Sequence, residues 1–286
     1  MTQSAQAELA RQFHDLHDGG TILVLPNAWD VTSARIFEDA GFPAIATTSA
    51  GIANSLGYPD GQKFPRAEML AVVRRIVEAV RVPVTADMLA GYGVTPEEVA
   101  DTVGEVLSAG AIGMNIEDGV DGKPDTLFAV DQQQERIRAA VEAAGRAQVP
   151  LVLNARTDVF LHAIGPVETR LARAIERLNA YRDAGASCLF AAGVTNKETI
   201  ARLVQGLQGP LNVLATPGIP PVAELAQLGV RRVSLGSGPM RATLGLLVRM
   251  AQQLRDDGLF ELMNEGIMPY PEANRLAQAE GEQANR

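Results

Sequence analysis

Cysteine is nearly absent from this sequence, in which Cys188 is the single thiol among 286 residues. One thiol cannot form an intrachain disulfide, so other interactions must hold the fold, as is usual in a reducing compartment. No apolar run approaches the roughly 20 residues that span a membrane. The first residues contain acids rather than the apolar stretch of a secretory signal. These absences predict a cytoplasmic protein that does not enter membranes.

Positive charge is also scarce, because 25 Lys and Arg face 34 Asp and Glu, a formal net charge of −9. Such a surface repels nucleic-acid phosphates and anionic lipids, so we expect neither as a partner. The few lysines lie outside the predicted strands, which disfavours an aldolase that works through a Schiff base. The histidines, His14, His17 and His162, lack the spacing of a metal site. Glycine-rich nucleotide-binding motifs are absent as well.

What the sequence does contain is an alternation of short apolar runs and amphipathic stretches. Most of the runs are apolar throughout, which is typical of strands buried on both faces. Eight parallel strands joined by helical crossovers close into a (β/α)8 TIM barrel. An open doubly wound sheet is the alternative, but it often has a glycine-rich first turn, which is not found here. The eight predicted strands are 21–25, 44–48, 83–87, 113–117, 151–155, 187–191, 211–215 and 232–235.

The stretches between these strands predict the helices of the barrel. The clearest start is Thr95-Pro96-Glu97-Glu98, which offers an N-cap, a proline in the first turn and two acids. We expect residues 1–258 to form a single barrel domain and residues 259–286 a C-terminal helical tail. The tail mixes apolar residues with prolines, so it needs a surface to cover. Either a partner subunit or its own barrel could provide that surface.

Charged residues gather where three neighbouring strands are predicted to end. Asp87 closes the third strand, Glu117 closes the fourth and Arg156 follows the fifth. The carboxyl ends of barrel strands carry the active site, so these side chains should share one rim. Asp87 and Glu117 are hard oxygen ligands without nearby His or Cys, which favours Mg²⁺ or Mn²⁺. Arg156 suits bidentate binding of a carboxylate.

The long segment after the second strand adds two further features. Ser49, Ala50 and Gly51 are small residues that can present N–H groups and a hydroxyl to an anion. Asp60, in the same segment, is either a turn residue or part of the site. A metal, an arginine and such a loop together describe a receptor for a small 2-oxo acid. The metal would stabilise the enolate that forms when a bond of the substrate breaks.

Four segments carry a family resemblance: residues 27–61, ADMLAGYG at 86–93, GMNIEDG at 113–119 and NARTD at 154–158. In this order they resemble the isocitrate lyase/phosphoenolpyruvate mutase superfamily, over about residues 20–250. The resemblance implies a Mg²⁺-dependent enzyme that makes or breaks a C–C or P–C bond of a 2-oxo acid. It also implies a homo-oligomer, a dimer or tetramer, often with the last helix exchanged between subunits.

The resemblance also assigns roles to individual positions. Asp87 matches a metal-binding aspartate, and Glu117 matches a glutamate that acts on metal-bound water. Arg156 matches a substrate-binding arginine. The predicted catalytic residues are therefore Asp60, Glu117 and Arg156, the substrate-binding residues are Ser49, Ala50, Gly51, Asp87 and Arg156, and the metal ligands are Asp87 and Glu117.

Three departures from the family pattern limit the reaction that can be named. Leu89 stands where members often have a second acid, and Ala192 stands where lyases have a glutamate. The loop after the fourth strand lacks the KKCGH-like motif whose cysteine acts as acid or base in the lyases, which argues against isocitrate and methylisocitrate lyase activity.

We expect cleavage of a C–C bond in a small 2-oxo acid, by decarboxylation, hydrolysis or retro-aldol chemistry. A phosphonate mutase or phosphonopyruvate hydrolase is an alternative, although Lys123 is the only cation in that loop. A 2-oxo-acid-binding protein with little activity is another.

Overall fold

The structure is a computed structural model that describes residues 2–278. Its main sheet begins and ends with two pieces of the first strand, β1 (Leu23–Leu25) and β2 (Asn27–Ala28). Pro26, which has no N–H to donate, separates them. At this point the strand changes partner, because β1 pairs with β11 (Arg232–Ser234) and β2 with β3 (Ile45–Thr47). The sheet therefore closes on itself, which confirms the predicted TIM barrel.

All pairings in this sheet are parallel, in the order β1-β11-β10-β9-β8-β5-β4-β3-β2. The remaining barrel strands are β4 (Val84–Asp87), β5 (Gly113–Glu117), β8 (Val152–Thr157), β9 (Cys188–Ala191) and β10 (Leu211–Leu214). Each predicted apolar run overlaps one of the eight barrel strands. The fifth strand runs to Thr157 rather than ending at residue 155, so it carries Arg156 within it.

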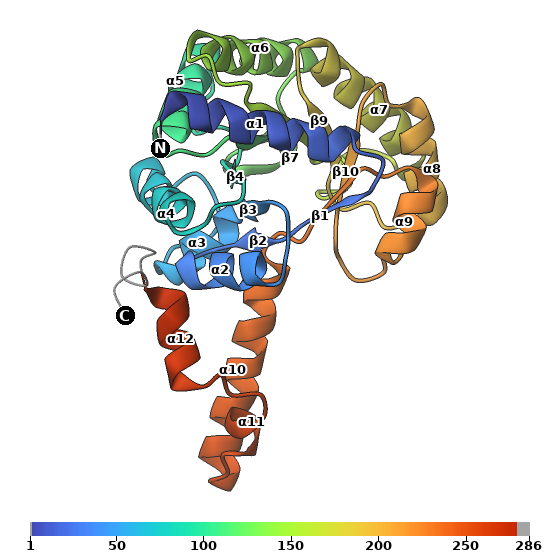
Figure 1. Ribbon diagram of the computed structural model, residues 1–286. Helices are drawn as coiled ribbons and strands as arrows, with labels where there is room; N and C mark the ends of the chain where they lie inside the picture. The colour runs from blue at the N-terminus through green and yellow to red at the C-terminus, as the bar shows by residue number, and fades with distance from the viewer. Residues whose placement is uncertain (1, 279–286) are drawn as a thin grey trace.

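A ring of helices covers the barrel (Figure 1). The helices that follow successive barrel strands are α2 (Val31–Asp39), α4 (Arg66–Ala79), α5 (Pro96–Ser108), α6 (Val130–Arg146), α7 (Val167–Asp183), α8 (Lys197–Gly206), α9 (Val222–Leu228) and α10 (Gly238–Asp257). The predicted cap of α5 is present: the Thr95 hydroxyl accepts from the N–H of Glu98, whose carboxylate accepts from the N–H of Thr95. Within residues 2–278, no helix is both long and apolar enough to cross a membrane.

An N-terminal helix that the sequence analysis did not identify, α1 (Gln3–Asp18), lies across the end of the barrel where the strands begin (Figure 1). The Gln6 amide donates to the carbonyls of Leu107 and Ala111, at 2.8 and 3.0 Å, just before β5 starts. Phe13 is fully buried, and a Cβ on Gly113 would lie 3.1 Å from its ring. This helix covers one end of the barrel, and the carboxyl ends of the strands lie at the other.

Two segments expected to be loops contain regular structure. A short helix, α3 (Ser49–Ser55), begins directly after β3, with Thr48 as its N-cap. The segment after β5 forms a hairpin of β6 (Gly119–Val120) and β7 (Lys123–Leu127), outside the barrel sheet. Lys123 thus belongs to a strand of this hairpin, contrary to the expectation that no lysine lies in a strand.

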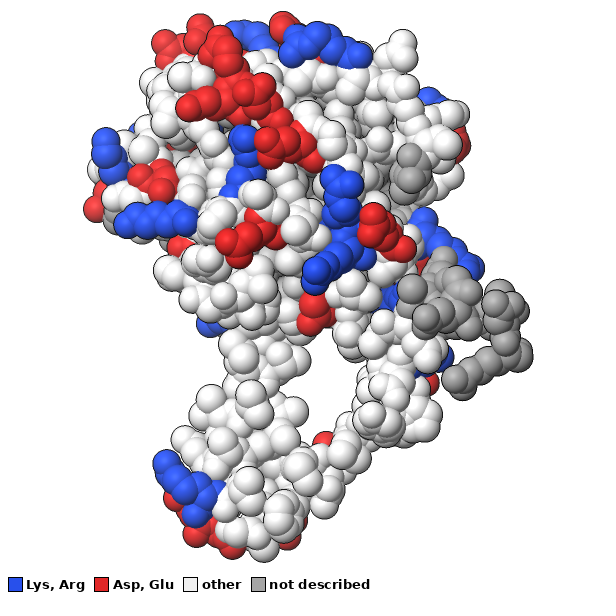
Figure 2. Space-filling model, turned by 90° about the vertical axis from the view of Figure 1, so that its left-hand side faces the viewer, with Lys and Arg blue, Asp and Glu red and all other residues white. Residues whose placement is uncertain are grey.

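The C-terminal helices leave the barrel and return to it. The arm, which we define as α10 with α11 (Glu261–Asn264), projects away from the barrel, and α12 (Tyr270–Ala277) lies beside α2 (Figure 1). Leu276 is buried there, and the Arg35 guanidinium donates to the carbonyls of Arg275 and Leu276 at 3.3 and 3.2 Å. By contrast, the one buried residue of α10 is Met240, and much of the arm is uncharged surface (Figure 2). Part of the tail therefore packs on its own barrel, and the arm does not.

Candidate active site

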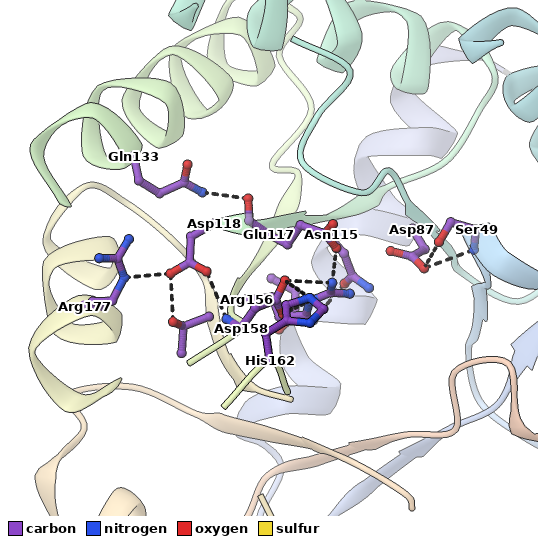
Figure 3. A network of polar contacts seen from close by, with 12 residues as sticks. Ser49, Asp87, Asn115, Glu117, Asp118, Gln133, Arg156, Asp158, His162 and Arg177 are labelled. Atoms are coloured by element: carbon purple, nitrogen blue, oxygen red, sulfur yellow. Dashed lines mark hydrogen bonds and ion pairs between the residues drawn. The ribbon is translucent and has the colours of Figure 1, made fainter. Parts of the chain in front are cut away.

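The charged residues predicted to meet at the strand ends lie along one rim, with Asp87 beside Ser49 and Arg156 beside Asp158 (Figure 3). Asp87 is the last residue of β4, and Glu117 is the last residue of β5. The register of the parallel ladder places Asp87 beside Asn115 and Glu117 beside Arg156. Each side chain is delivered by a rigid, buried strand rather than by a loop. This rim lies at the end of the barrel opposite α1.

One oxygen of Asp87 is fixed by the start of α3, and the other is free. The N–H and hydroxyl of Ser49 donate to Oδ2 of Asp87 at 3.0 and 2.9 Å. The N–H of Asp87 itself donates to the Thr47 hydroxyl at 3.0 Å. Oδ1 of Asp87 is buried and has no hydrogen-bond partner within the described chain. A buried carboxylate oxygen without a partner is costly, and a cation is the ligand that best relieves this cost.

Arg156 lies between two carboxylates at the centre of the rim. Its Nε donates to Oδ1 of Asp158 at 2.7 Å, its Nη2 donates to Oδ2 at 3.1 Å, and Nη2 also forms an ion pair with Glu117. Burial raises the pKa of Glu117 well above its usual value, although the charge of Arg156 acts in the opposite direction. Burial disfavours the charged guanidinium of Arg156, but Asp158 and Glu117 overcome this effect and raise its pKa. Arg156 is therefore a permanent positive charge held in a fixed orientation.

A buried acid, Asp118, supports this arrangement from behind. Its side chain accepts hydrogen bonds from the Thr157 hydroxyl at 2.7 Å and from the N–H of Asp158 at 2.9 Å. It also accepts from Arg177 and from the Tyr181 hydroxyl, both at 2.7 Å. Because Asp118 fixes the backbone of Asp158, it indirectly orients the carboxylate that holds the arginine. Sequence reasoning missed this role because the two donors on α7 lie 59 and 63 residues further along the chain.

The segment after β4 is held in an unusual conformation by α6. Leu89 and Tyr92 have φ angles of 54° and 52°, which side chains with a Cβ rarely adopt. The buried Arg136 guanidinium donates to the carbonyl of Gly93 at 2.9 Å and to that of Ala90. Gln133, one turn earlier on α6, donates to the Glu117 carbonyl at 3.2 Å. One helix thus fixes the segments that follow both predicted metal-ligand strands.

Asp60 also faces this rim. The residue as a whole is exposed, but loss of hydration around its carboxylate and the charge of Asp87 raise its pKa, while Arg156 lowers it. The structure therefore brings Asp60 close to Asp87, Glu117 and Arg156, and does not leave it as an isolated turn residue. Tyr92 lies nearby: burial and the charge of Asp87 raise its pKa, and its hydroxyl has no partner among the described residues.

The predicted anion-binding loop has a different construction from the one expected. Ser49, Ala50 and Gly51 form the first turn of α3 instead of an open loop. The N–H of Ser49 already donates to Asp87, and that of Gly51 donates to the Thr48 hydroxyl at 3.3 Å. Gly51 is closely packed, since a Cβ there would lie 2.9 Å from the Cβ of Trp29. Its requirement for glycine therefore comes from packing, and the role of this turn in substrate binding stays a prediction.

A cavity of about 270 Å³ opens beside the rim, under the β6–β7 hairpin. Glu117 and Asp158 line it from the barrel, and Asp121 and Lys123 line it from the hairpin. His162, which follows β8 by one turn of chain, completes the wall. The position of His162 in the sequence predicts no such role, because it lacks the spacing of a metal ligand.

The donor atoms at the rim fit a weakly enclosed magnesium or manganese ion. Within the described chain, no three His, Cys, Asp or Glu side chains stand close enough to hold a metal ion by themselves. Mg²⁺ usually takes one or two protein carboxylates and fills its other positions with water and substrate oxygens. Asp87, with its free oxygen, and Glu117 match that need, whereas a zinc cage would require more ligands.

Comparison with known proteins identifies the relatives of this arrangement. The family model described as phosphoenolpyruvate phosphomutase matches residues 13–255. An oxaloacetate decarboxylase of Pseudomonas fluorescens (strain SBW25) is 31% identical over 253 residues, covering 85% of this chain and 84% of the relative. A presumed lyase/mutase from Burkholderia cenocepacia J2315 superposes with a TM-score of 0.90 at 40% identity, over 97% of this chain and 98% of that one. Oxaloacetate acetylhydrolase in complex with the product oxalate superposes with a TM-score of 0.85 at 28% identity, over 97% and 96% of the two chains.

The family model covers the barrel from α1 into α10, which includes every residue placed at the rim. The relatives extend over nearly the same length, so the likeness is not confined to one motif. The chain therefore belongs to the phosphoenolpyruvate phosphomutase family, within the isocitrate lyase/phosphoenolpyruvate mutase superfamily.

Proposed function

We propose that this protein is a Mg²⁺-dependent enzyme that cleaves a C–C bond of a small 2-oxo acid, with oxaloacetate as the model substrate. The observation that carries the proposal is the pairing of a fixed guanidinium with a free, buried carboxylate oxygen at one rim. Arg156 supplies the first and Asp87 the second. Relatives named for reactions of oxaloacetate support this choice of substrate.

Arg156 would bind the carboxylate of the substrate. Its orientation is set in advance by the two hydrogen bonds to Asp158, so little freedom is lost when substrate binds. Asp87 and Glu117 would hold the Mg²⁺, which supplies positive charge for the keto oxygen as the bond breaks. In hydrolysis, Glu117 would accept a proton from water in its ionised form, which the guanidinium of Arg156 and a bound cation both favour. Asp60 has a raised pKa as well, and its carboxylate lies close enough to influence the ionisation of Glu117.

Two reactions are consistent with these groups. In decarboxylation, the bond between C3 and the distal carboxylate breaks, CO₂ leaves and the electron pair becomes a pyruvate enolate. In hydrolysis, water adds to the keto carbon, the C2–C3 bond breaks, and oxalate and acetate form. The missing family cysteine is no obstacle to either bond cleavage, because the electron pair is accepted by the substrate and not by that residue.

The test is a substrate screen with Mg²⁺ that includes oxaloacetate, 2,3-dimethylmalate and phosphonopyruvate. We expect cleavage of a C–C bond in a 2-oxo acid, and loss of that activity when EDTA removes the metal. The Asp87→Ala variant should lose Mg²⁺-dependent binding of oxalate, measured by calorimetry, because it removes the free oxygen. Asp101→Ala is the matched control, since Asp101 is an exposed acid of α5. Turnover that survives EDTA, or oxalate binding unchanged in Asp87→Ala, would refute the metal assignment.

The same screen separates the alternatives. Phosphonopyruvate as the preferred substrate would identify a P–C bond enzyme. Tight binding of oxalate without turnover of any substrate would identify a 2-oxo-acid-binding protein. Neither outcome alters the family to which the chain belongs.

We also propose that the protein is a homo-oligomer, with the barrel of residues 1–258 as its domain and the arm as part of the interface. Leu247 and Val248 on α10 are 58% and 56% exposed, and Phe260, just before α11, is 54% exposed. Large exposed apolar side chains of this kind often mark a subunit interface. Light scattering after size-exclusion chromatography tests this proposal. A monomer at micromolar concentration would refute it.

A further inference from the structure

His162 is an ionisable residue beside the rim that the proposed function leaves without a task. Its N–H donates to the Asp158 carbonyl at 3.0 Å, which turns the chain back over the end of β8. Its Nε2 lies 3.8 Å from Oδ2 of Asp158, and 39% of its side chain is exposed. Figure 3 shows the ring beside Arg156 and Asp158. The ring therefore faces both the site and solvent.

The same cavity joins His162 to the proposed reaction site. Glu117, a proposed metal ligand, lines this cavity of about 270 Å³ on one side and His162 lines it on another. The charged groups that face the histidine are Asp158 on its own segment, Glu117 on β5, and Asp121 and Lys123 on the hairpin. Three of these four groups are acids, so His162 lies in a wall of the cavity that is mainly acidic.

The proposed chemistry requires a proton donor close to C3 of the substrate. Decarboxylation, hydrolysis and retro-aldol cleavage all leave the electron pair of the broken bond on C3 of the substrate. The reaction ends when C3 takes up a proton. Asp158 is committed to Arg156 through two hydrogen bonds. Glu117 is paired with the same guanidinium and, as a proposed metal ligand, would be ionised and have no proton to give. Position 192, which follows β9, holds an alanine with no proton to give.

We propose that His162 is the general acid that protonates C3 of the enolate released by C–C bond cleavage. This inference rests on the proposed function. The imidazolium gives the proton on Nε2 to C3, the electron pair of the enolate forms the new C–H bond, and the keto group or carboxylate of the product is restored. The neutral imidazole then regains a proton from water at its exposed edge. Histidine suits this step because its ordinary pKa lies near neutrality, whereas lysine is a far weaker acid.

The test compares wild-type protein with His162→Gln, using oxaloacetate or whichever 2-oxo acid proves to be the substrate. We expect kcat to fall about 100-fold, the usual contribution of a general acid. The Kd of oxalate with Mg²⁺ should stay within about twofold, because the carboxylate-binding groups are intact. The decline of kcat at alkaline pH should disappear in the variant, and added imidazole should restore part of the rate. His14→Gln, a half-buried histidine of α1 at the other end of the barrel, is the matched control and should behave as wild type.

The outcomes distinguish this inference from the function on which it rests. Wild-type protein that cleaves no 2-oxo acid refutes the proposed function, and the inference with it. Wild-type turnover, with an unchanged kcat and pH profile in His162→Gln, refutes the inference alone. Parallel loss of kcat and oxalate binding, without rescue by imidazole, would mean that His162 is structural and would also refute it.

Discussion

Replacement of Arg136 by methionine should destabilise the protein and loosen the segment that follows Asp87. Burial lowers the pKa of this arginine to about 10, so it remains charged at neutral pH. The guanidinium lies 4.0 Å from the Phe128 ring centroid and donates to the carbonyls of Ala90 and Gly93. Each hydrogen bond from a charged donor contributes about 1.5–3 kcal/mol. Methionine can fill the space of the side-chain stem but leaves both carbonyls without a donor, so we expect a loss of about 3 kcal/mol.

Urea unfolding followed by circular dichroism measures this loss. Arg138→Met is the matched control, because it is the same change two residues further along α6 on an exposed position. It should alter the free energy of unfolding by less than about 0.5 kcal/mol. Arg136→Met should also weaken Mg²⁺-dependent oxalate binding, since the backbone after Asp87 is no longer fixed. Equal stabilities of the two variants would show that Arg136 does not hold this segment.

Two further predictions concern Leu89 and His17. Leu89→Asp should raise the affinity for Mg²⁺ in calorimetry, because it adds a carboxylate two residues from Asp87. The φ angle of residue 89 is 54°, which aspartate tolerates better than leucine. Leu89→Asn is the control, since it shares this tolerance without the charge, and equal Mg²⁺ affinities of the two variants would contradict the alignment. Burial and the charge of Arg232 lower the pKa of His17 to about 3, so the unfolded chain binds the proton more tightly and stability is lost as pH falls below about 6.5. Between pH 6.5 and pH 5 this loss amounts to about 1.6 kcal/mol. The comparison of urea unfolding at the two pH values should reveal it in wild type and not in His17→Leu, and parallel losses in both proteins would contradict the assignment.

The barrel could be predicted from the sequence because its strands are buried on both faces and therefore read as continuous apolar runs. The charged rim could be predicted for a related reason: Asp87 and Glu117 interrupt such runs where the strands end. Helix α1 was not predicted, although residues 7, 10, 13 and 17 repeat at helical spacing and are all buried.

The contacts that support the site could not be predicted from the sequence, for a different reason. Arg177 and Tyr181 are polar residues on the inner face of α7. No local sequence pattern predicts that both donate hydrogen bonds to Asp118. Similarly, the sequence shows Ser49 as part of a run of small residues, whereas in the structure it holds one oxygen of Asp87. Such pairings depend on how far each helix is rotated and shifted against the barrel. Tertiary packing decides that rotation, and sequence periodicity does not.

The charges at the rim explain why two of its acids resist ionisation. Asp60, Asp87, Glu117 and Asp158 lie close enough to influence one another, and they share the guanidinium of Arg156. Burial raises the pKa of Asp60 and of Glu117, and the neighbouring carboxylates raise both further. The rim therefore carries more negative than positive charge, and this excess is the electrostatic basis for proposing a divalent cation at Asp87. Because a bound cation would favour the ionised acids, Mg²⁺ binding should release protons, and its affinity should weaken as the pH falls.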